Sequence, residues 1–219
     1  MVKKVLMLHG LAQSGPYFES KTKGFRRVLE PLGYEFYYPT APTKCSPADI
    51  STDIDDLGAS SADDYHTWIV PDPVNNEYRL PDITRTFLRE YILEHGPFDG
   101  IIGFSQGAAV AGYLLTDFNH LLDLTEEQQP TLKFCILFMG FRFKPDVYQE
   151  QYIKHPITVP SMHVAGQLDT VVDVAKIHDL HATCVEGTGT YLEHSGGHFV
   201  PNSKGFVTKV AEWLQSLPE

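Results

Sequence analysis

Short apolar runs alternate along the chain with longer stretches in which apolar residues recur every three to four positions. The runs are typical of buried parallel strands, and the longer spacing predicts amphipathic helices. We expect strands at Lys3 to Leu8, Tyr34 to Tyr38, Asp99 to Phe104, Leu132 to Met139, Ile157 to Ala165 and Thr190 to His194. We expect helices at about Tyr17 to Leu32, Pro81 to His95, Gln106 to Asp117, near Asp173 and at Phe206 to Leu217. This alternation predicts an α/β fold, a mainly parallel sheet of about six strands with helices on both faces.

The stretch from Thr40 to Leu80 departs from this pattern. It shows no long hydrophobic period and carries several prolines and many acidic residues. Long segments of this kind inside compact domains are usually functional lids or disordered. We therefore interpret residues 1–219 as one domain with a lid or insertion at about 40–80. A linker between two domains is the alternative, although too little chain precedes it to form a domain.

Composition excludes several classes of function. The 219 residues are 42% hydrophobic and carry a net charge of −11, which argues against general nucleic-acid binding or an anionic membrane surface. The apolar run at the N-terminus is too short for a signal peptide, and no stretch approaches the ~20 apolar residues of a membrane span. Cys45, Cys135 and Cys184 are scattered, without a disulfide framework or a metal-site spacing. We expect a cytoplasmic protein with no metal site.

The strongest chemical signal is the G-x-S-x-G motif Gly103-Phe-Ser-Gln-Gly107, which lies between a predicted strand and a predicted helix. A nucleophilic serine must stand on a sharp turn, and glycines two positions before and after Ser105 remove Cβ atoms that would collide there. The N-terminus of the following helix offers free N–H groups to a developing oxyanion. We interpret Ser105 as a nucleophile; a merely structural glycine-rich turn is the alternative.

A serine nucleophile needs a base within hydrogen-bond reach and an acid that orients the base. In α/β-hydrolases the chain order is Ser, Asp or Glu, then His, each after a strand. His198 follows the last predicted strand on a Gly-Gly loop and is the predicted base, whereas His194 lies within that strand. Asp169 follows the tight turn after the preceding strand and is the predicted acid. Its competitor, Asp173, precedes a helix and resembles an N-cap.

Two backbone N–H groups are predicted to bind the oxyanion. One is that of Gln106, directly after the nucleophile, and the other comes from the His-Gly loop after the first strand. Leu11 is the predicted second donor. We expect His9 to brace this loop rather than to take part in the chemistry.

These motifs together make the chain similar to the fungal FSH family of serine hydrolases, which belongs to the α/β-hydrolase superfamily. The matching segments are Val5–Gly10, Gly96–Ala108, Gly140–Phe143, Gly166–Asp169 and His194–Pro201, which span almost the whole chain. The resemblance implies that Ser105, Asp169 and His198 are catalytic, with carboxylesterase-type activity that needs no cofactor.

We therefore expect a serine hydrolase that cleaves small-molecule carboxylic esters or thioesters. A peptidase is possible on this fold, but nothing in the sequence indicates a pocket for an amine. Two alternatives are a non-catalytic ligand-binding protein on a hydrolase scaffold and an interaction protein whose acidic stretch at 40–80 is the working part. The sequence does not predict an oligomeric state.

The substrate pocket is expected to be apolar. Phe141 and Phe143 leave the strand after the nucleophile unit and are predicted to lie beside the acyl site. Trp68, together with Tyr65 and Ile69, is predicted to line the same slot from the lid, with Arg142 pointing away. This arrangement favours hydrophobic acyl esters over short or anionic ones. The alternative is that these aromatic residues belong to the core.

Overall fold

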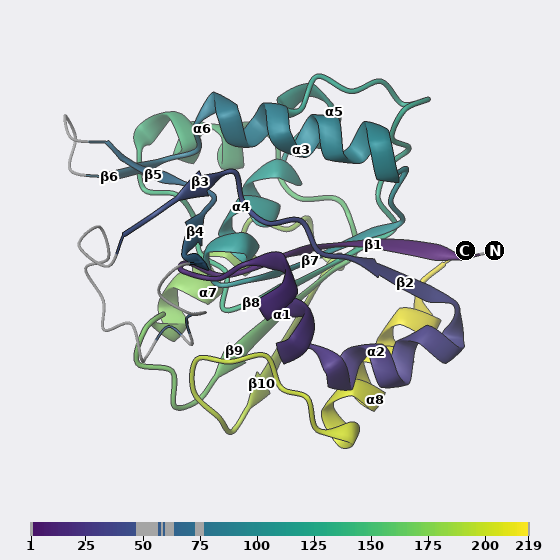
Figure 1. Cartoon of the computed structure of the whole chain (residues 1–219). Helices are drawn as coiled ribbons and strands as arrows, with labels where there is room; N and C mark the ends of the chain where they lie inside the picture. The colour runs from purple at the N-terminus through teal and green to yellow at the C-terminus, as the bar shows by residue number, and fades with distance from the viewer. Residues whose placement is uncertain (1, 47–56, 58, 60–63, 73–76, 219) are drawn as a thin grey trace.

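A six-stranded parallel sheet forms the centre of the fold (Figure 1). The computed structural model describes residues 2–46, 57, 59, 64–72 and 77–218. The strands are β1 (Lys3–Leu8), β2 (Tyr34–Tyr37), β7 (Gly100–Phe104), β8 (Phe134–Phe138), β9 (Ser161–Gly166) and β10 (Gly189–His194). Their order is β10-β9-β8-β7-β1-β2, and every neighbouring pair is parallel. The predicted α/β-hydrolase architecture is therefore confirmed.

Each face of the sheet buries its own hydrophobic cluster, because alternate strand residues point to opposite sides. In β1, Leu6 and Leu8 belong to one cluster, whereas Val5 and Met7 belong to the other. The first cluster is covered by α3 (Asp82–His95), α4 (Gln106–Leu114) and α6 (Asp146–Lys154). The second is covered by α1 (Gly15–Lys21), α2 (Lys23–Leu29) and α8 (Lys204–Ser216). Figure 1 shows these two groups of helices above and below the sheet.

The strand order brings the loops after β1 and β7 together. The chain runs from β1 to the edge strand β2 and then crosses back to β7, on the other side of β1. Ligands of open α/β sheets bind at such a reversal, beyond the carboxyl ends of the strands. The helix α7 (Val174–His181) follows β9 at the same edge of the sheet.

The helices differ from the prediction in three respects. The helix expected from Tyr17 to Leu32 is divided into α1, α2 and the 3-10 turn η1 (Glu30–Leu32). The break lies at Thr22, whose hydroxyl donates to the carbonyl of Phe18 at 2.9 Å and bonds the hydroxyl of Tyr38 at 2.7 Å. The short helices α5 (Phe118–Leu121) and α6 were not predicted, and α4 ends before the expected Asp117.

The described part of the 40–80 stretch forms two small antiparallel pairs. They are β3 (Thr43–Lys44) with β4 (His66–Thr67), and β5 (Val70–Asp72) with β6 (Glu77–Arg79). The predicted lid also covers residues 47–56, 58, 60–63 and 73–76, which lie outside the described residues. Among the helices that the structure describes, none combines the length and the apolar character needed to cross a membrane.

Candidate active site

Ser105 occupies a strained turn between β7 and α4. Its backbone has φ 51° and ψ −115°, in the positive-φ region that side-chain-bearing residues rarely adopt. A Cβ atom on Gly103 would lie 2.6 Å from the backbone of Ala108, and one on Gly107 would lie 2.2 Å from the carbonyl oxygen of Leu8. Both positions therefore require glycine, as the motif predicted, because the helix starts directly against the neighbouring strand ends.

Ser105, His198 and Asp169 come from different strand ends and form one hydrogen-bonded chain. The Oγ of Ser105 lies 3.0 Å from Nε2 of His198, and Nδ1 of His198 lies 2.8 Å from Oδ2 of Asp169. The side chains of His198 and Asp169 are only 3% and 1% exposed. A histidine that donates Nδ1–H to a carboxylate presents an unprotonated Nε2, which can accept the serine proton.

The environment of Asp169 favours its ionised form. Its Oδ1 accepts hydrogen bonds from the backbone N–H groups of Val171 at 2.8 Å and Val172 at 2.9 Å. Burial would raise the pKa of Asp169, but the hydrogen bonds from His198 and from these two N–H groups outweigh it and hold the pKa below its usual range. Asp169 can therefore stabilise a protonated His198.

The competing residues lie apart from this chain. Asp173 is exposed and caps α7, because its carboxylate accepts from the N–H of Ala175 at 2.8 Å. His194 ends β10, and its Nδ1 accepts from the N–H of Gly196 at 3.1 Å. Gly166 allows the loop of His198 to pack closely, since a Cβ there would lie 2.6 Å from the carbonyl oxygen of Gly197.

The loop after β1 faces Ser105 and is braced by His9, as expected. Nδ1 of His9 donates to the carbonyl of Gly10 at 2.7 Å, and Nε2 accepts from the N–H of Ala41 at 3.0 Å. Burial lowers the pKa of His9 to about 4, so the ring is neutral. Leu11 and Gln106, the predicted oxyanion donors, both line the cavity that contains Ser105. Neither backbone N–H donates a hydrogen bond to a described residue, so both are free to donate to a ligand.

Sequence reasoning missed the role of the Gln106 side chain and misplaced Trp68. Oε1 of Gln106 accepts from the N–H of Trp68 at 2.7 Å and from the hydroxyl of Thr67 at 3.1 Å. Nε1 of Trp68 donates to the carbonyl of His9 at 2.9 Å. Trp68 is fully buried in the core and is not among the residues that line the cavity. The prediction that it lines the substrate slot is corrected: its ring is enclosed between the His9 loop and α3.

The cavity beside Ser105 has a volume of about 580 Å³. Phe141, Phe143 and Ile69 line it, as predicted. Arg142 is also among the lining residues, so the cavity is not free of basic residues. The chain after β8 is not an extended strand, and Met139 turns it with φ 50°, so side chains no longer alternate between two sides.

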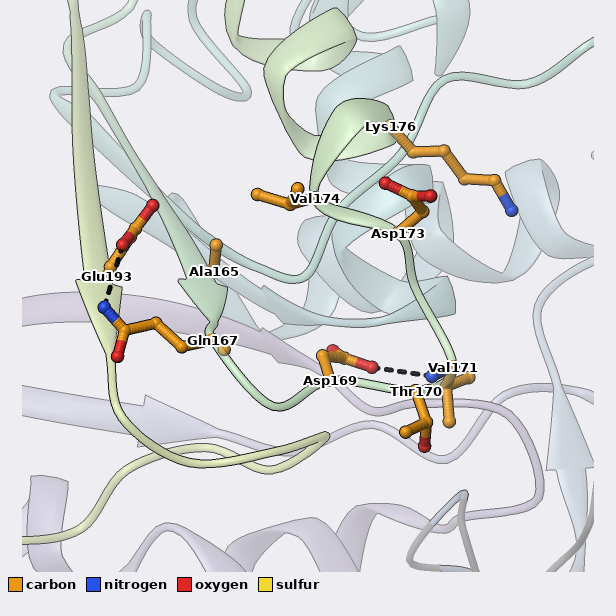
Figure 2. Close-up of a pocket in the computed structure, with 10 residues that line it drawn as sticks. Ala165, Gln167, Asp169, Thr170, Val171, Asp173, Val174, Lys176 and Glu193 are labelled. Carbon is orange, nitrogen blue, oxygen red and sulfur yellow. Dashed lines mark hydrogen bonds between the residues drawn. The ribbon is translucent and has the colours of Figure 1, made fainter.

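A second cavity, of about 540 Å³, is lined by Asp169 and shares Val171 and Lys176 with the first (Figure 2). Its lining includes Gln167, Asp169, Asp173 and Glu193, but not Ser105. In Figure 2 the amide of Gln167 reaches Glu193, a bond of 3.0 Å across the ends of β9 and β10. Within the described ranges, no group of three or more His, Cys, Asp and Glu side chains could hold a metal ion. The first cavity is therefore the candidate site for chemistry at Ser105.

Comparison with known proteins identifies relatives over the full length of the chain. A family model described as serine hydrolase (FSH1) matches residues 1–210. Family of serine hydrolases 2 from Saccharomyces cerevisiae is 56% identical, over 99% of this chain and 100% of its own length. Family of serine hydrolases 3 from the same yeast is 44% identical, over 98% of this chain and 84% of its own length. Acyl-protein thioesterase 2 from Zea mays has a similar fold, with a TM-score of 0.64 and 18% identity over 98% of this chain and 93% of its own.

Proposed function

Because this chain belongs to the serine hydrolase (FSH1) family and is a hydrolase, we propose that it cleaves carboxylic esters or thioesters through an acyl-enzyme on Ser105. One observation carries this proposal. A hydrogen-bonded chain runs from Ser105 through His198 to Asp169 and begins inside a cavity large enough for a small molecule.

The proposed reaction uses each of these groups in turn. Nε2 of His198 takes the hydroxyl proton while Oγ of Ser105 attacks the acyl carbonyl. The N–H groups of Leu11 and Gln106 donate to the oxyanion that forms, and Asp169 stabilises the charged imidazole. His198 then passes its proton to the departing alcohol or thiol. Water repeats the sequence on the acyl-enzyme and releases the carboxylic acid.

A ligand-binding protein on a hydrolase scaffold is the main alternative. It gives no reason for the backbone strain at Ser105, which costs of order 1–3 kcal/mol in comparable turns. A receptor also has no need for a histidine whose unprotonated nitrogen lies 3.0 Å from the serine hydroxyl. Both features serve a nucleophile, so the geometry supports the enzyme.

The test combines a fluorophosphonate probe with p-nitrophenyl esters. The probe is expected to label Ser105, and Ser105→Ala is expected to lose the label and about 10³-fold or more in kcat/KM. Ser195→Ala is the matched control, because Ser195 is exposed in the loop of His198 and its side chain forms no hydrogen bond to a described residue. Undiminished turnover in Ser105→Ala would refute the assignment. A folded wild type without labelling or turnover would favour the ligand-binding alternative.

A further inference from the structure

The lining of the Ser105 cavity carries more basic than acidic side chains, in a chain whose overall charge is acidic. Arg142, Lys144 and Lys176 line it together with Glu77 and Asp179. The whole sequence, by contrast, has 17 Lys and Arg against 28 Asp and Glu. The described lining, with three basic and two acidic residues, is therefore opposite in the sign of its charge to the chain as a whole.

Arg142 is the best placed of these cations. Its guanidinium lies 4.8 Å from the ring centroid of Tyr152, a contact that holds the group in position. Its Nε is buried and has no hydrogen-bond partner among the described residues. No ion pair joins Arg142 to Glu77, Asp179 or any other described carboxylate, although both acids line the same cavity. An unpaired guanidinium charge beside a cavity is costly, and an anion bound by its two terminal nitrogens would offset that cost.

We propose that this cavity selects esters or thioesters that carry an anionic group, a carboxylate or a phosphate, which Arg142 binds. The inference rests on the proposed function, because it names the substrate class of the same site. A guanidinium presents its donors in a planar fork that matches both kinds of anion. Lys144 and Lys176, both exposed, add to the positive field at the mouth of the cavity. Phe141 and Phe143 contact the apolar part of the substrate.

This proposal reverses the substrate preference expected from the sequence. That expectation assumed an apolar slot without a cation, and the premise fails because three basic residues line the cavity. Apolar side chains remain part of the lining, so the predicted substrate is amphipathic: a hydrophobic segment with one anionic end. A neutral ester of the same length is expected to react more slowly.

The test compares substrates that differ only in one charge. The first pair is p-nitrophenyl hydrogen suberate and its methyl ester, with the carboxylate on the acyl side and too far from the reacting carbonyl to attack it. The second pair is 4-acetoxybenzoate and its methyl ester, with the carboxylate on the leaving group. The third compares 4-acetoxyphenyl phosphate with its dimethyl ester. Each ratio of kcat/KM is divided by the ratio of uncatalysed hydrolysis rates in the same buffer, which removes differences in intrinsic reactivity.

In at least one pair, the wild type is expected to favour the anionic member by about tenfold, which corresponds to ~1.4 kcal/mol. The pair that responds tells whether the anion is carboxylate or phosphate, and on which side of the ester it lies. Arg142→Met is expected to abolish this preference, and Arg142→Lys to keep part of it, because the charge remains but the fork is lost. Arg27→Met is the control, since Arg27 is exposed on α2 outside the cavity. Raising the ionic strength is expected to weaken the preference.

Several results would overturn the inference. If the wild type hydrolyses neutral esters through Ser105 but shows no anionic preference in any pair, the inference fails while the proposed function stands. An unchanged preference in Arg142→Met has the same meaning. If Arg142→Met does not fold, Arg142→Lys and Lys176→Met, at an exposed position, replace it in the test. Wild-type ratios of kcat/KM between anionic and neutral substrates in both variants would then overturn the inference. Absence of labelling and of turnover with all substrates refutes the proposed function and this inference together.

Discussion

Replacing Asp169 with asparagine tests the orientation of His198 most directly. The backbone N–H groups of Val171 and Val172 both donate to Oδ1 of Asp169, while Oδ2 faces Nδ1 of His198. Asparagine keeps its single oxygen toward the two N–H groups, so its NH₂ group must face His198. A donor at that place requires Nδ1 to be unprotonated and moves the ring proton to Nε2. The ring then presents N–H to Ser105 and cannot act as a base.

The size of the effect follows from the competing orientation of the amide. Turning the oxygen toward His198 restores the base but leaves two buried N–H groups without an acceptor, at about 1–3 kcal/mol each. The active orientation is therefore populated at about one part in 30 at the lower limit of ~2 kcal/mol. We expect kcat to fall at least about thirtyfold, and up to the ~10⁴-fold loss that the same change causes in serine proteases.

The assay is steady-state hydrolysis of a p-nitrophenyl ester, with unfolding in urea as the check on folding. Asp173→Asn is the matched control, because Asp173 caps α7 from an exposed position and asparagine caps helices equally well. We expect its kcat to stay within about twofold of the wild type. Wild-type kcat in Asp169→Asn, or a large loss in Asp173→Asn instead, would refute the reasoning.

Three further predictions concern the scaffold around the site. Burial lowers the pKa of His163 to about 3 and that of His9 to about 4, so below about pH 6.5 the unfolded chain binds protons that the folded chain excludes. As the pH is lowered, the free energy of unfolding is expected to fall by up to about 1.4 kcal/mol per pH unit for each histidine. His163→Asn should remove about half of this slope in urea titrations, and an unchanged slope would contradict the prediction. Gly107→Ala is expected to lose folding or activity, because its Cβ would lie 2.2 Å from the carbonyl oxygen of Leu8, whereas Gly205→Ala, with open space around it, should keep both. Gln106→Met leaves the N–H of Trp68 without its acceptor and is expected to cost about 1–3 kcal/mol of unfolding free energy, which a wild-type urea midpoint would disprove.

Local rules account for the parts of the fold that the sequence predicted. Strand residues such as Leu6 and Met7 alternate between the two clusters, and glycine is needed at 103 and 107 because the turn itself leaves no room for a Cβ. The order Ser105, Asp169, His198 could be placed because each residue lies in the loop or turn that follows a strand. These features depend on residues near one another in the chain, so the pattern carries them.

The predictions that failed depend on contacts between residues that are distant in the sequence. The helix break at Thr22 involves the hydroxyl of Tyr38, and the burial of Trp68 depends on His9 and Gln106, which lie far away in the sequence. The alternation rule cannot place the side chain of Arg142, because the chain is no longer a strand beyond the end of β8. Periodicity holds no information on which remote group accepts a hydrogen bond or where a strand stops pairing.

The contacts that hold Ser105 in its strained turn come from segments remote in sequence. Its N–H donates to the carbonyl of Phe138 at 2.8 Å, and the adjacent Gln106 receives the N–H of Trp68. The carbonyl of Trp68 in turn accepts from the hydroxyl of Thr84 on α3, at 2.7 Å. The backbone strain is confined to Ser105, whereas the hydrogen bonds that offset it come from several segments. A substitution that removes the hydrogen bonds of Trp68 or Thr84 is therefore expected to lower stability and kcat together. Arg142 lies outside this network of bonds, so we expect changes there to alter the choice of substrate without that shared loss. On this reasoning, stability and selectivity are expected to depend on separate residues around one nucleophile.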